Sequence, residues 1–215
     1  HKKTTSYLPS GADKDLFFVA PKNKQLMNKL GIAPTEKVVL FAGTLYNFSG
    51  LDILISYLGK NPNLYPGYKL VIVGHGVQWQ KLKKIIRHYH LEKKVIMTGF
   101  VEYSQLNKYI NLSDVCINPF LINKITDIIF PGKIYQYLAC GKPVVASPLR
   151  GIVDIFPINN NAGILYARTT NPKETMDTIK KALKAKVNDK NPCLQEISFV
   201  LEKKLARLVA RKTKT

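Results

Sequence analysis

Short apolar segments alternate with amphipathic ones along most of this chain, and this alternation limits the folds that it can adopt. The apolar segments, such as KVVLFA at 37–42, are too short for helices and are typical of strands buried on both faces. Between them, apolar residues recur at helical spacing, as Leu82, Ile85 and Ile86 do. We expect strands at 37–42, 68–73, 95–98, 114–118, 143–147 and 163–166. Such strands, joined by helical crossovers, predict an α/β fold: a doubly wound parallel sheet with helices on both faces.

The expected helices have recognisable ends. One helix is expected over Gly50–Leu58, and another begins where Ser104 can cap it. A third covers Lys133–Ala139, and Asn171-Pro172 supplies an N-cap followed by proline for a fourth. A last helix is expected near Gln195–Arg211, whereas the segment before the first strand is expected to be a polar linker. No internal repeat divides the chain, so residues 1–215 are interpreted as a single domain.

The chain carries a formal net charge of +19, which favours anionic partners. Its lysines are spread over the whole length of the chain, so most of them are interpreted as residues on solvent-exposed faces. Attraction to an anionic membrane surface is the alternative. A nucleic-acid surface would interleave basic residues with stacking aromatics, and the sequence has no such stripe, so we expect no nucleic acid as a partner.

The cellular location is inferred from the cysteines and from the apolar segments. Cys116 and Cys140 lie inside apolar segments and Cys193 leaves an odd set, which favours buried free thiols of an intracellular protein. No apolar run approaches the roughly 20 residues of a membrane span. The amino end has no hydrophobic signal segment. We therefore expect a cytoplasmic protein, with peripheral contact to the cytoplasmic membrane face left open.

The stretch from Thr126 to Ser147 combines a polar loop, the start of a helix and a buried strand. The helix opens on Pro131-Gly132-Lys133, where free backbone N–H groups beside a lysine favour a phosphorylated ligand. Proline is tolerated there because the first N–H groups of a helix have no partner inside it. Gly132 allows a ligand to approach the backbone closely. The helix dipole disfavours a lysine at this end, so a phosphate contact accounts for Lys133 better than solvation does.

Six short motifs, in this order and spacing, resemble the donor-binding domain of retaining glycosyltransferases of family 4, which have the GT-B fold. They are YLPSGAD from Tyr7, FAGTL from Phe41, SGLD from Ser49, VIVGHG from Val71, TGFV from Thr98, and the block from Lys133 to Ser147. The resemblance extends to about residue 210 and implies a Rossmann-like C-terminal domain that ends in a crossover helix. It also implies that the N-terminal, acceptor-binding domain is absent from this chain.

The resemblance further implies that the donor is a nucleoside-diphosphate sugar, such as a UDP- or GDP-sugar. Its diphosphate is expected beside Gly43, Thr44, Ser49 and Gly50, with His75 facing the same cleft. The base is expected against Gly99, Phe100 and Val101. Further donor contacts are expected at Thr126, Ile128, Pro131, Gly132 and Ile134. The catalytic candidates are Asp127, Lys133 and Gln136, and neither a cofactor nor a metal is expected.

The motif glutamates of the family are both replaced in this chain. Counting back from Gly141, the two glutamates of the E-x7-E motif fall on Ile128 and Gln136. Gln136 can still hydrogen-bond a ribose hydroxyl, although without charge. Ile128 cannot contact a sugar hydroxyl in that way, so Thr126 or Asp127 is the candidate for that role.

The two diphosphate-binding cations of the family are replaced as well. Its arginine and lysine fall on Thr44 and Ser49. The change removes two charge-assisted hydrogen bonds, each worth roughly 1.5–3 kcal/mol. Positive charge would then have to come from Lys133, Lys124 or Arg150.

The expected function is transfer of a sugar from the donor to a glycan or lipid-linked acceptor, retaining and metal-independent, with this chain as the donor-binding half. A sugar-nucleotide epimerase with the GT-B fold is one alternative, although it needs poised carboxylates in a chain with few acidic residues. A degenerate, non-catalytic scaffold or membrane-surface module is another. A dinucleotide site at Gly74-His75-Gly76 is disfavoured because Trp79 replaces the third glycine. His88 and His90 diverge on a helix, so no metal site is expected there.

Overall fold

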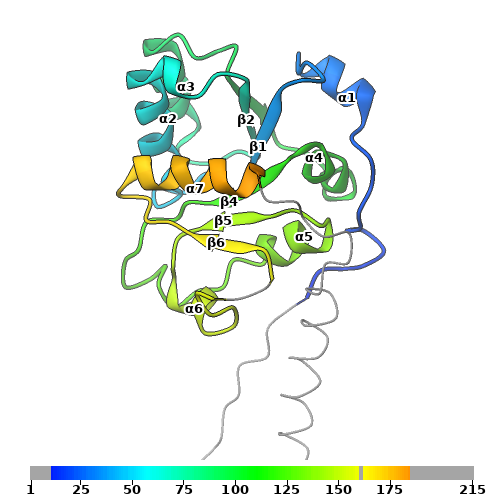
Figure 1. The fold of residues 1–215 in the computed structure, drawn as a ribbon, viewed down its shortest axis with the longest axis vertical. Coiled ribbons are helices and arrows are strands. Elements are labelled where there is room, and N and C mark those ends of the chain that lie inside the picture. Colours follow the sequence, from blue (N-terminus) through cyan, green and yellow to red (C-terminus); the bar gives the residue numbers. More distant parts are fainter. Residues whose placement is uncertain (1–10, 160–161, 185–215) are drawn as a thin grey trace, which may run out of the picture.

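The protein is described by a computed structural model, which defines residues 11–159 and 162–184. Its centre is a six-stranded parallel sheet in the order β3-β2-β1-β4-β5-β6 (Figure 1). The strands are β1 (Lys37–Ala42), β2 (Tyr68–Val73), β3 (Val95–Gly99), β4 (Val115–Asn118), β5 (Val144–Ala146) and β6 (Ile164–Tyr166). The sequence-based prediction of a doubly wound α/β fold is therefore confirmed, because this order reverses direction between β1 and β4.

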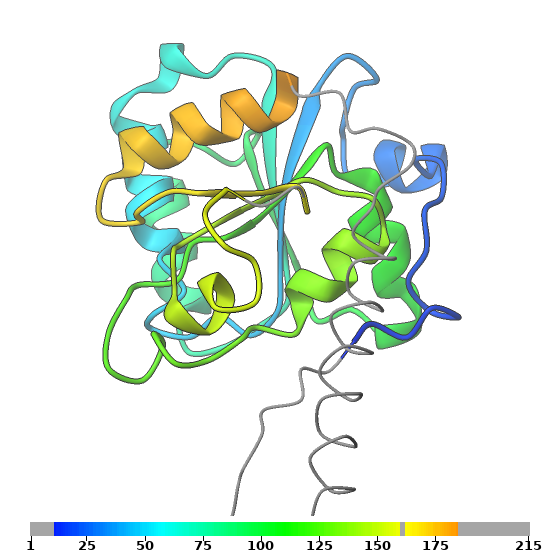
Figure 2. The same ribbon diagram turned by 60° about the horizontal axis from the view of Figure 1, so that its bottom comes forward.

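Helices cover both faces of the sheet (Figures 1 and 2). On one face, α2 (Leu51–Lys60) contacts both α3 (Trp79–His88) and α7 (Pro172–Lys184). On the other face lie α4 (Leu106–Leu112), which contacts β1, and α5 (Lys133–Ala139), which contacts β5. The shorter helices are α1 (Lys24–Lys29), α6 (Arg150–Val153), η1 (Pro62–Leu64) and η2 (Tyr103–Gln105).

Burial on both faces explains why the central strands are almost wholly apolar. In β1 every residue after Lys37 is buried, and all four residues of β4 are buried. Both α2 and α3 bury an apolar stripe against the sheet, as the helical spacing predicts. In α2 this stripe is Leu51, Leu54, Ile55 and Leu58. None of the helices in the described ranges is long and apolar enough to cross a bilayer.

The segment before the first strand is held against α4 by two asparagine side chains. Asn107 accepts a hydrogen bond from the backbone N–H of Phe18 at 3.3 Å. Asn111 accepts from the N–H of Ala20 at 2.9 Å and donates to the carbonyl of Phe18 at 2.9 Å. Lys22 then pairs with Asp114 at 2.7 Å. Residues 18–22 therefore follow α4 through specific polar contacts.

Two local predictions differ from the structure. The expected linker contains a short helix, α1, whose N-cap Asn23 accepts a hydrogen bond from the N–H of Leu26. The prediction that Ser104 caps a helix is wrong, because α4 starts after the 3-10 turn η2 and has no side-chain cap bond. The expected strands, the helix at Lys133–Ala139 and the cap at Asn171 are confirmed. The final helix near Gln195–Arg211 and Cys193 lie outside the described residues, while Cys116 and Cys140 are free and buried as predicted.

Candidate functional site

The carboxyl ends of β1 and β4 form the switch point of the sheet, where the chain leaves toward opposite faces. In doubly wound folds the ligand crevice lies at this point, because the two following loops diverge. Pairing between β1 and β4 is limited to Val39 with Val115 and Leu40 with Cys116. The ladder between β1 and β2 continues to Ala42. The two central strands therefore separate before β1 ends.

The hydroxyl of Tyr137 occupies the space between the separating strands. It accepts a hydrogen bond from the backbone N–H of Ala42 at 2.8 Å and donates to the carbonyl of the same residue at 3.2 Å. Tyr137 comes from α5 and is fully buried. One side chain thus satisfies two backbone groups of β1 that β4 does not pair.

Replacing Tyr137 with phenylalanine is expected to lower the free energy of unfolding by about 2–4 kcal/mol, because it leaves two buried backbone groups of Ala42 without a partner. Urea denaturation followed by circular dichroism measures this change. The matched control is Tyr109→Phe, since none of the described hydrogen bonds involves the Tyr109 hydroxyl, and it should change stability by less than about 0.5 kcal/mol. Equal effects of the two substitutions would contradict the role assigned to Tyr137.

Lys133, at the start of α5, reaches into the switch point. Its ammonium nitrogen lies 3.9 Å from the centre of the Phe41 ring and 4.6 Å from that of Phe120. A Cβ atom added to Gly43, directly after β1, would lie 2.9 Å from the same nitrogen. Among the residues that the structure describes, no hydrogen bond or ion pair to the Lys133 ammonium is formed. The cation is therefore held by two aromatic faces and a glycine, without a counter-charge.

Burial has a direct electrostatic consequence for Lys133. Removing the ammonium from water lowers the pKa of Lys133 to about 7, against an ordinary value of 10.5. Cation–π attraction offsets part of the loss of solvation, since each such contact contributes about 0.5–2 kcal/mol. A bound anion would restore the charged form. A lysine whose pKa is strongly shifted by desolvation is a candidate for a functional group.

The loop between β1 and α2 runs from Gly43 to Gly50 beside this cation. Thr44 is exposed, whereas Ser49 has no accessible surface and its hydroxyl donates to the side-chain oxygen of Gln78 at 3.3 Å. Gly50 adopts a left-handed conformation, with φ of 68°, as the N-cap of α2. A side-chain contact from Ser49 to a ligand would require its bond to Gln78 to break, and its backbone N–H already donates to the carbonyl of Tyr46 at 3.0 Å.

The two loops that follow β2 and β3 lie next to each other on the same edge. The backbone N–H of Gly74 donates to the carbonyl of Gly99 at 2.8 Å. His75 is exposed and its ring stacks on Trp79, with ring centres 4.7 Å apart. Phe100 exposes 75% of its surface and Val101 is partly buried. An exposed phenylalanine beside a glycine turn can stack on an aromatic ligand.

The middle of the loop between β4 and α5 carries the predicted residues Thr126 and Asp127, and both are engaged in hydrogen bonds within the protein. Thr126 is fully buried, and its hydroxyl donates to the carbonyl of Leu121 at 2.5 Å. Asp127 accepts hydrogen bonds from the backbone N–H of Arg150 at 3.0 Å and from its Nε at 2.5 Å. These bonds hold the pKa of Asp127 below its ordinary value. Asp127 and Thr126 therefore act first as structural groups in this loop.

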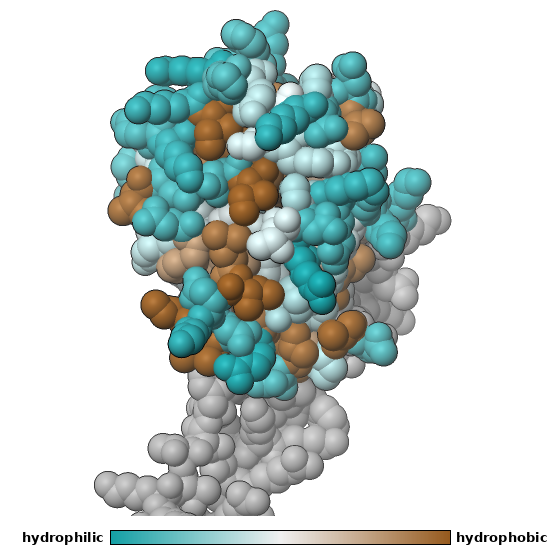
Figure 3. All heavy atoms as spheres, turned by 90° about the vertical axis from the view of Figure 1, so that its left-hand side faces the viewer, coloured by the Kyte–Doolittle hydropathy of each residue, from teal (hydrophilic) through white to brown (hydrophobic). Residues whose placement is uncertain are grey.

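Exposed isoleucines mark the same loop. Ile122, Ile125 and Ile128 expose 48%, 72% and 66% of their surface. Figure 1 places this loop at the lower end of the molecule, and hydrophobic residues are more frequent in the lower half of the face drawn in Figure 3. Ile128, which falls on the first motif glutamate, is accessible to a ligand or to another domain.

The start of α5 carries the remaining predicted residues. Gln136 is partly exposed and donates from its amide to the hydroxyl of Tyr103 at 3.1 Å. Gly132 is exposed and its backbone is open, with nothing within 4 Å of an added Cβ. Pro131 and Ile134 are buried, and Ile134 has no accessible surface. Gly132 and Gln136 are thus available to a ligand, while Pro131 and Ile134 shape the helix start from within.

Several residues at the site escaped prediction. Two of them, Phe41 and Phe120, contact Lys133, and Tyr137 bonds to β1 where it separates from β4. In the sequence, nothing distinguishes these three residues from ordinary core residues. The side-chain amide of Asn118, at the end of β4, is fully buried and has no hydrogen-bond partner among the described residues. An unpartnered buried amide is unusual in a folded protein and marks this edge as polar. Within residues 11–159 and 162–184, no group of three potential metal ligands is found.

The family model of the glycosyl transferases of group 1 matches residues 22–194. A GDP-mannose-dependent alpha-(1-6)-phosphatidylinositol monomannoside mannosyltransferase of Mycobacterium tuberculosis is 28% identical over 168 residues. The match covers 76% of this chain and 43% of that enzyme. The chain spans about a third of the length of the first curated relatives that it matches.

Two solved structures share the fold. The C-terminal domain of a group 1 family glycosyl transferase from Francisella tularensis superposes with a TM-score of 0.63 at 14% identity, over 81% of this chain and 89% of that domain. The Anabaena protein HepE, solved in complex with UDP and glucose, superposes with a TM-score of 0.69 at 18% identity, over 94% of this chain and 56% of HepE. Both matches show that the chain shares the Rossmann-like α/β fold of these two proteins.

Proposed function

We propose, since the chain belongs to the glycosyl transferases of group 1, that it is the donor-binding half of an enzyme that transfers a sugar from a nucleoside-diphosphate sugar. The single observation that carries this proposal is Lys133. An ammonium that is withdrawn from water and has no counter-charge among the described residues favours an anion, and a diphosphate is the anion that the switch point of a doubly wound sheet binds. Lys133 would thereby replace the cations that are lost at Thr44 and Ser49.

The other groups at the edge fit the remaining parts of a nucleotide sugar. The exposed ring of Phe100 and the backbone at Gly99 would lie against the base. Gln136 would hydrogen-bond the ribose, and in doing so would exchange its bond to Tyr103. Backbone N–H groups at the starts of α2 and α5 would assist Lys133 in stabilising charge on the leaving diphosphate. Because Arg150 pairs with Asp127 and lowers the pKa of its carboxylate, Asp127 would be a weak base. It would position the loop instead.

The finer features of the reaction are proposals that follow from the family. We propose a retaining, metal-independent transfer to a glycan or lipid-linked acceptor, with the acceptor held by a second domain outside this chain. We further propose a cytoplasmic location with peripheral contact to anionic membrane. The relative from Mycobacterium tuberculosis, whose acceptor is named as a phosphatidylinositol mannoside, supports a lipid-linked acceptor. HepE, solved with UDP, supports a uridine donor, whereas the same mycobacterial relative is named as GDP-mannose-dependent and supports a guanosine donor.

Titration calorimetry of the chain with UDP, GDP, ADP and CDP tests the proposal. In the absence of a second domain we expect a dissociation constant on the order of 0.1–1 mM for the preferred nucleotide. A clear preference among the four nucleotides would identify the donor class. Absence of heat for all four at millimolar concentration would contradict donor binding by this domain and would favour a non-catalytic module.

The affinity for the preferred nucleotide should depend on pH through Lys133. Its pKa of about 7 in the free protein means that the ammonium form becomes scarce above neutral pH. The second phosphate ionisation of the nucleotide lies near pH 6 and is complete in this range. We therefore expect the affinity to fall on the order of 10-fold between pH 7 and pH 8.5, with proton uptake on binding. An affinity that stays constant over this range would contradict contact between Lys133 and the diphosphate.

A further inference from the structure

A groove of about 380 Å³ lies along the outer edge of β3, the last strand of the sheet on that side. It separates α1 from α3, and both helices lie at the upper end of the molecule in Figure 1. Its lining contains three cationic side chains, the carboxylate of Glu92 and apolar residues of α3 and β3, among them Ile86 and Val95. The groove therefore starts where β3 begins, at Val95, whereas the donor site lies where the parallel strands end.

The lining combines apolar side chains with three cations and one carboxylate. Lys29, Lys83 and Arg87 form no ion pair with any carboxylate in the described part of the chain. Other lysines of the same region are paired: Lys22 with Asp114 and Lys81 with Asp52. Three unpaired cations around apolar side chains form a surface that is complementary to an anionic amphiphile.

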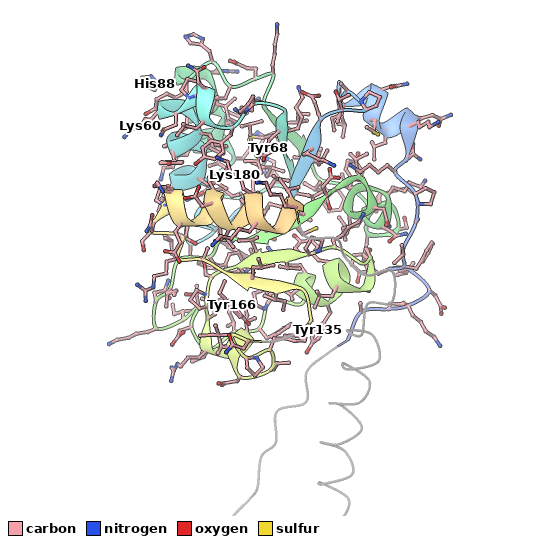
Figure 4. The ribbon with its side chains drawn as sticks, in the orientation of Figure 1. Lys60, Tyr68, His88, Tyr135, Tyr166 and Lys180 are labelled. Carbon is pink, nitrogen blue, oxygen red and sulfur yellow. The ribbon has the colours of Figure 1, made fainter. Side chains whose placement is uncertain are left out.

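The surface around the groove adds further positive charge. From Lys83 to Lys94 the sequence contains five lysines and arginines, and Glu92 is the one acidic residue in this stretch. Lys84, Arg87 and Lys93 are exposed. His88 projects from the outer end of α3, away from the sheet (Figure 4). Because α3 buries Leu82 and Ile86 in the core, its charged residues are directed to solvent.

We infer that this groove docks the protein on an anionic lipid bilayer. Lipid phosphates would lie between Lys29, Lys83 and Arg87, and the glycerol and upper acyl region would pack on the apolar side chains. The inference rests on the proposed function only in that a lipid-linked acceptor would be met at a membrane. Nucleic acid fits less well, because bases need aromatic faces to stack on and the lining contains no aromatic residue.

The position of the groove makes membrane docking compatible with donor binding. A bilayer against the start of β3 would not cover the carboxyl ends of β1 and β4, where Lys133 lies. Attraction of each lysine or arginine to an anionic surface decays within a Debye length, so binding through the groove should weaken strongly with salt.

Co-sedimentation of the full chain with vesicles tests the docking surface. Vesicles of phosphatidylcholine alone should bind weakly, and vesicles that also contain phosphatidylglycerol should bind well at low salt. The triple variant Lys29→Gln, Lys83→Gln, Arg87→Gln is expected to lose affinity for the anionic vesicles on the order of 100-fold. The control Lys108→Gln, Lys181→Gln, Lys184→Gln removes the same net charge from α4 and α7 and should lose less than about 5-fold.

Equal losses of vesicle affinity in the two triple variants would overturn the inference. Membrane attraction would then depend on the net charge of the chain and not on the cations of the groove. Retention of vesicle binding by the groove variant would overturn it as well. Binding of a single-stranded oligonucleotide is measured for comparison. If the groove variant lost as much affinity for the oligonucleotide as for the vesicles, membrane docking would not be the specific role of the groove. Circular dichroism confirms that the variants fold. Nucleotide titration of the groove variant should match the unaltered chain, so failure of donor binding and failure of membrane docking give different results.

Discussion

Replacing Lys133 with methionine is expected to abolish measurable nucleotide binding while making the protein more stable. The ammonium is the cation that we assign to the diphosphate, and loss of a charge-assisted contact should weaken binding about 10- to 100-fold. Methionine has a similar length and packs favourably on the rings of Phe41 and Phe120. Removing the cost of burying the ammonium should raise the free energy of unfolding by about 1–3 kcal/mol at pH 6, after allowance for the lost cation–π contacts.

The stability gain should have a characteristic pH dependence. Below pH 7 Lys133 is protonated in both the folded and the unfolded chain, so the folded state carries the full cost of the buried charge. Between pH 7 and about 10.5 the folded state binds fewer protons than the unfolded one, so the stability of the unaltered protein rises with pH. The advantage of Lys133→Met should therefore be largest near pH 6 and should fall continuously as the pH rises toward 10.

Urea denaturation at several pH values, together with nucleotide titration, tests both parts of this prediction. The matched control is Lys124→Met, at an exposed lysine of the loop before α5. It should leave both stability and affinity nearly unchanged. If Lys124→Met removed nucleotide binding and Lys133→Met did not, the phosphate contact would have to be assigned to Lys124.

Replacing Gly50 with alanine is expected to destabilise the protein by about 2–5 kcal/mol. A Cβ atom at Gly50 would lie 2.0 Å from the carbonyl oxygen of Pro119 and 2.4 Å from Cγ2 of Thr169. Because the nearer atom belongs to the backbone, the segment after β4 has to move. The left-handed conformation adds about 1–2 kcal/mol for any residue with a Cβ, and the displacement adds typically 1–3 kcal/mol. Pro119 precedes Phe120, so the pocket of Lys133 should be disturbed as well.

Gly67→Ala provides the matched control for this substitution. Gly67 has φ of 71°, nearly the same as the 68° of Gly50, but nothing lies within 4 Å of an added Cβ. Both variants carry the same conformational penalty and the same change in the entropy of the unfolded chain. Their difference in unfolding free energy, measured by urea denaturation, therefore isolates the contact with Pro119. A difference below about 1 kcal/mol would contradict close packing of α2 against the loop after β4.

The fold could be predicted from the sequence because its strands are buried on both faces, and such strands are visible as apolar runs. The segments 37–42 and 68–73 were predicted with the bounds that the structure has. The helix α1 was missed because it is short and buries only Met27, which leaves no periodic stripe to detect. Ser104 was expected to cap a helix because of its residue type, but a 3-10 turn intervenes and moves the helix start.

The candidate site was only partly predictable, since residue type does not reveal where a side chain turns. Lys133 stood out because a lysine at a helix start opposes the dipole. Thr126 and Ser49 have the same hydroxyl chemistry whether they face a ligand or the interior, and the structure turns both inward. The pairing of Asp127 with Arg150 joins residues far apart in the sequence. Likewise, nothing in the sequence indicates that the hydroxyl of Tyr137 bonds to the backbone of β1.

The asparagine contacts to residues 18–20 have a mechanical consequence for the two-domain enzyme proposed above. Because Asn107 and Asn111 bond to the backbone at Phe18 and Ala20, this segment moves with α4 as part of one rigid body. A hinge between this domain and a preceding one therefore has to lie on the amino side of Phe18. Phe17 on that side is buried in the core as well, so inside the described chain the hinge has to lie before it, where residues 13–15 are exposed.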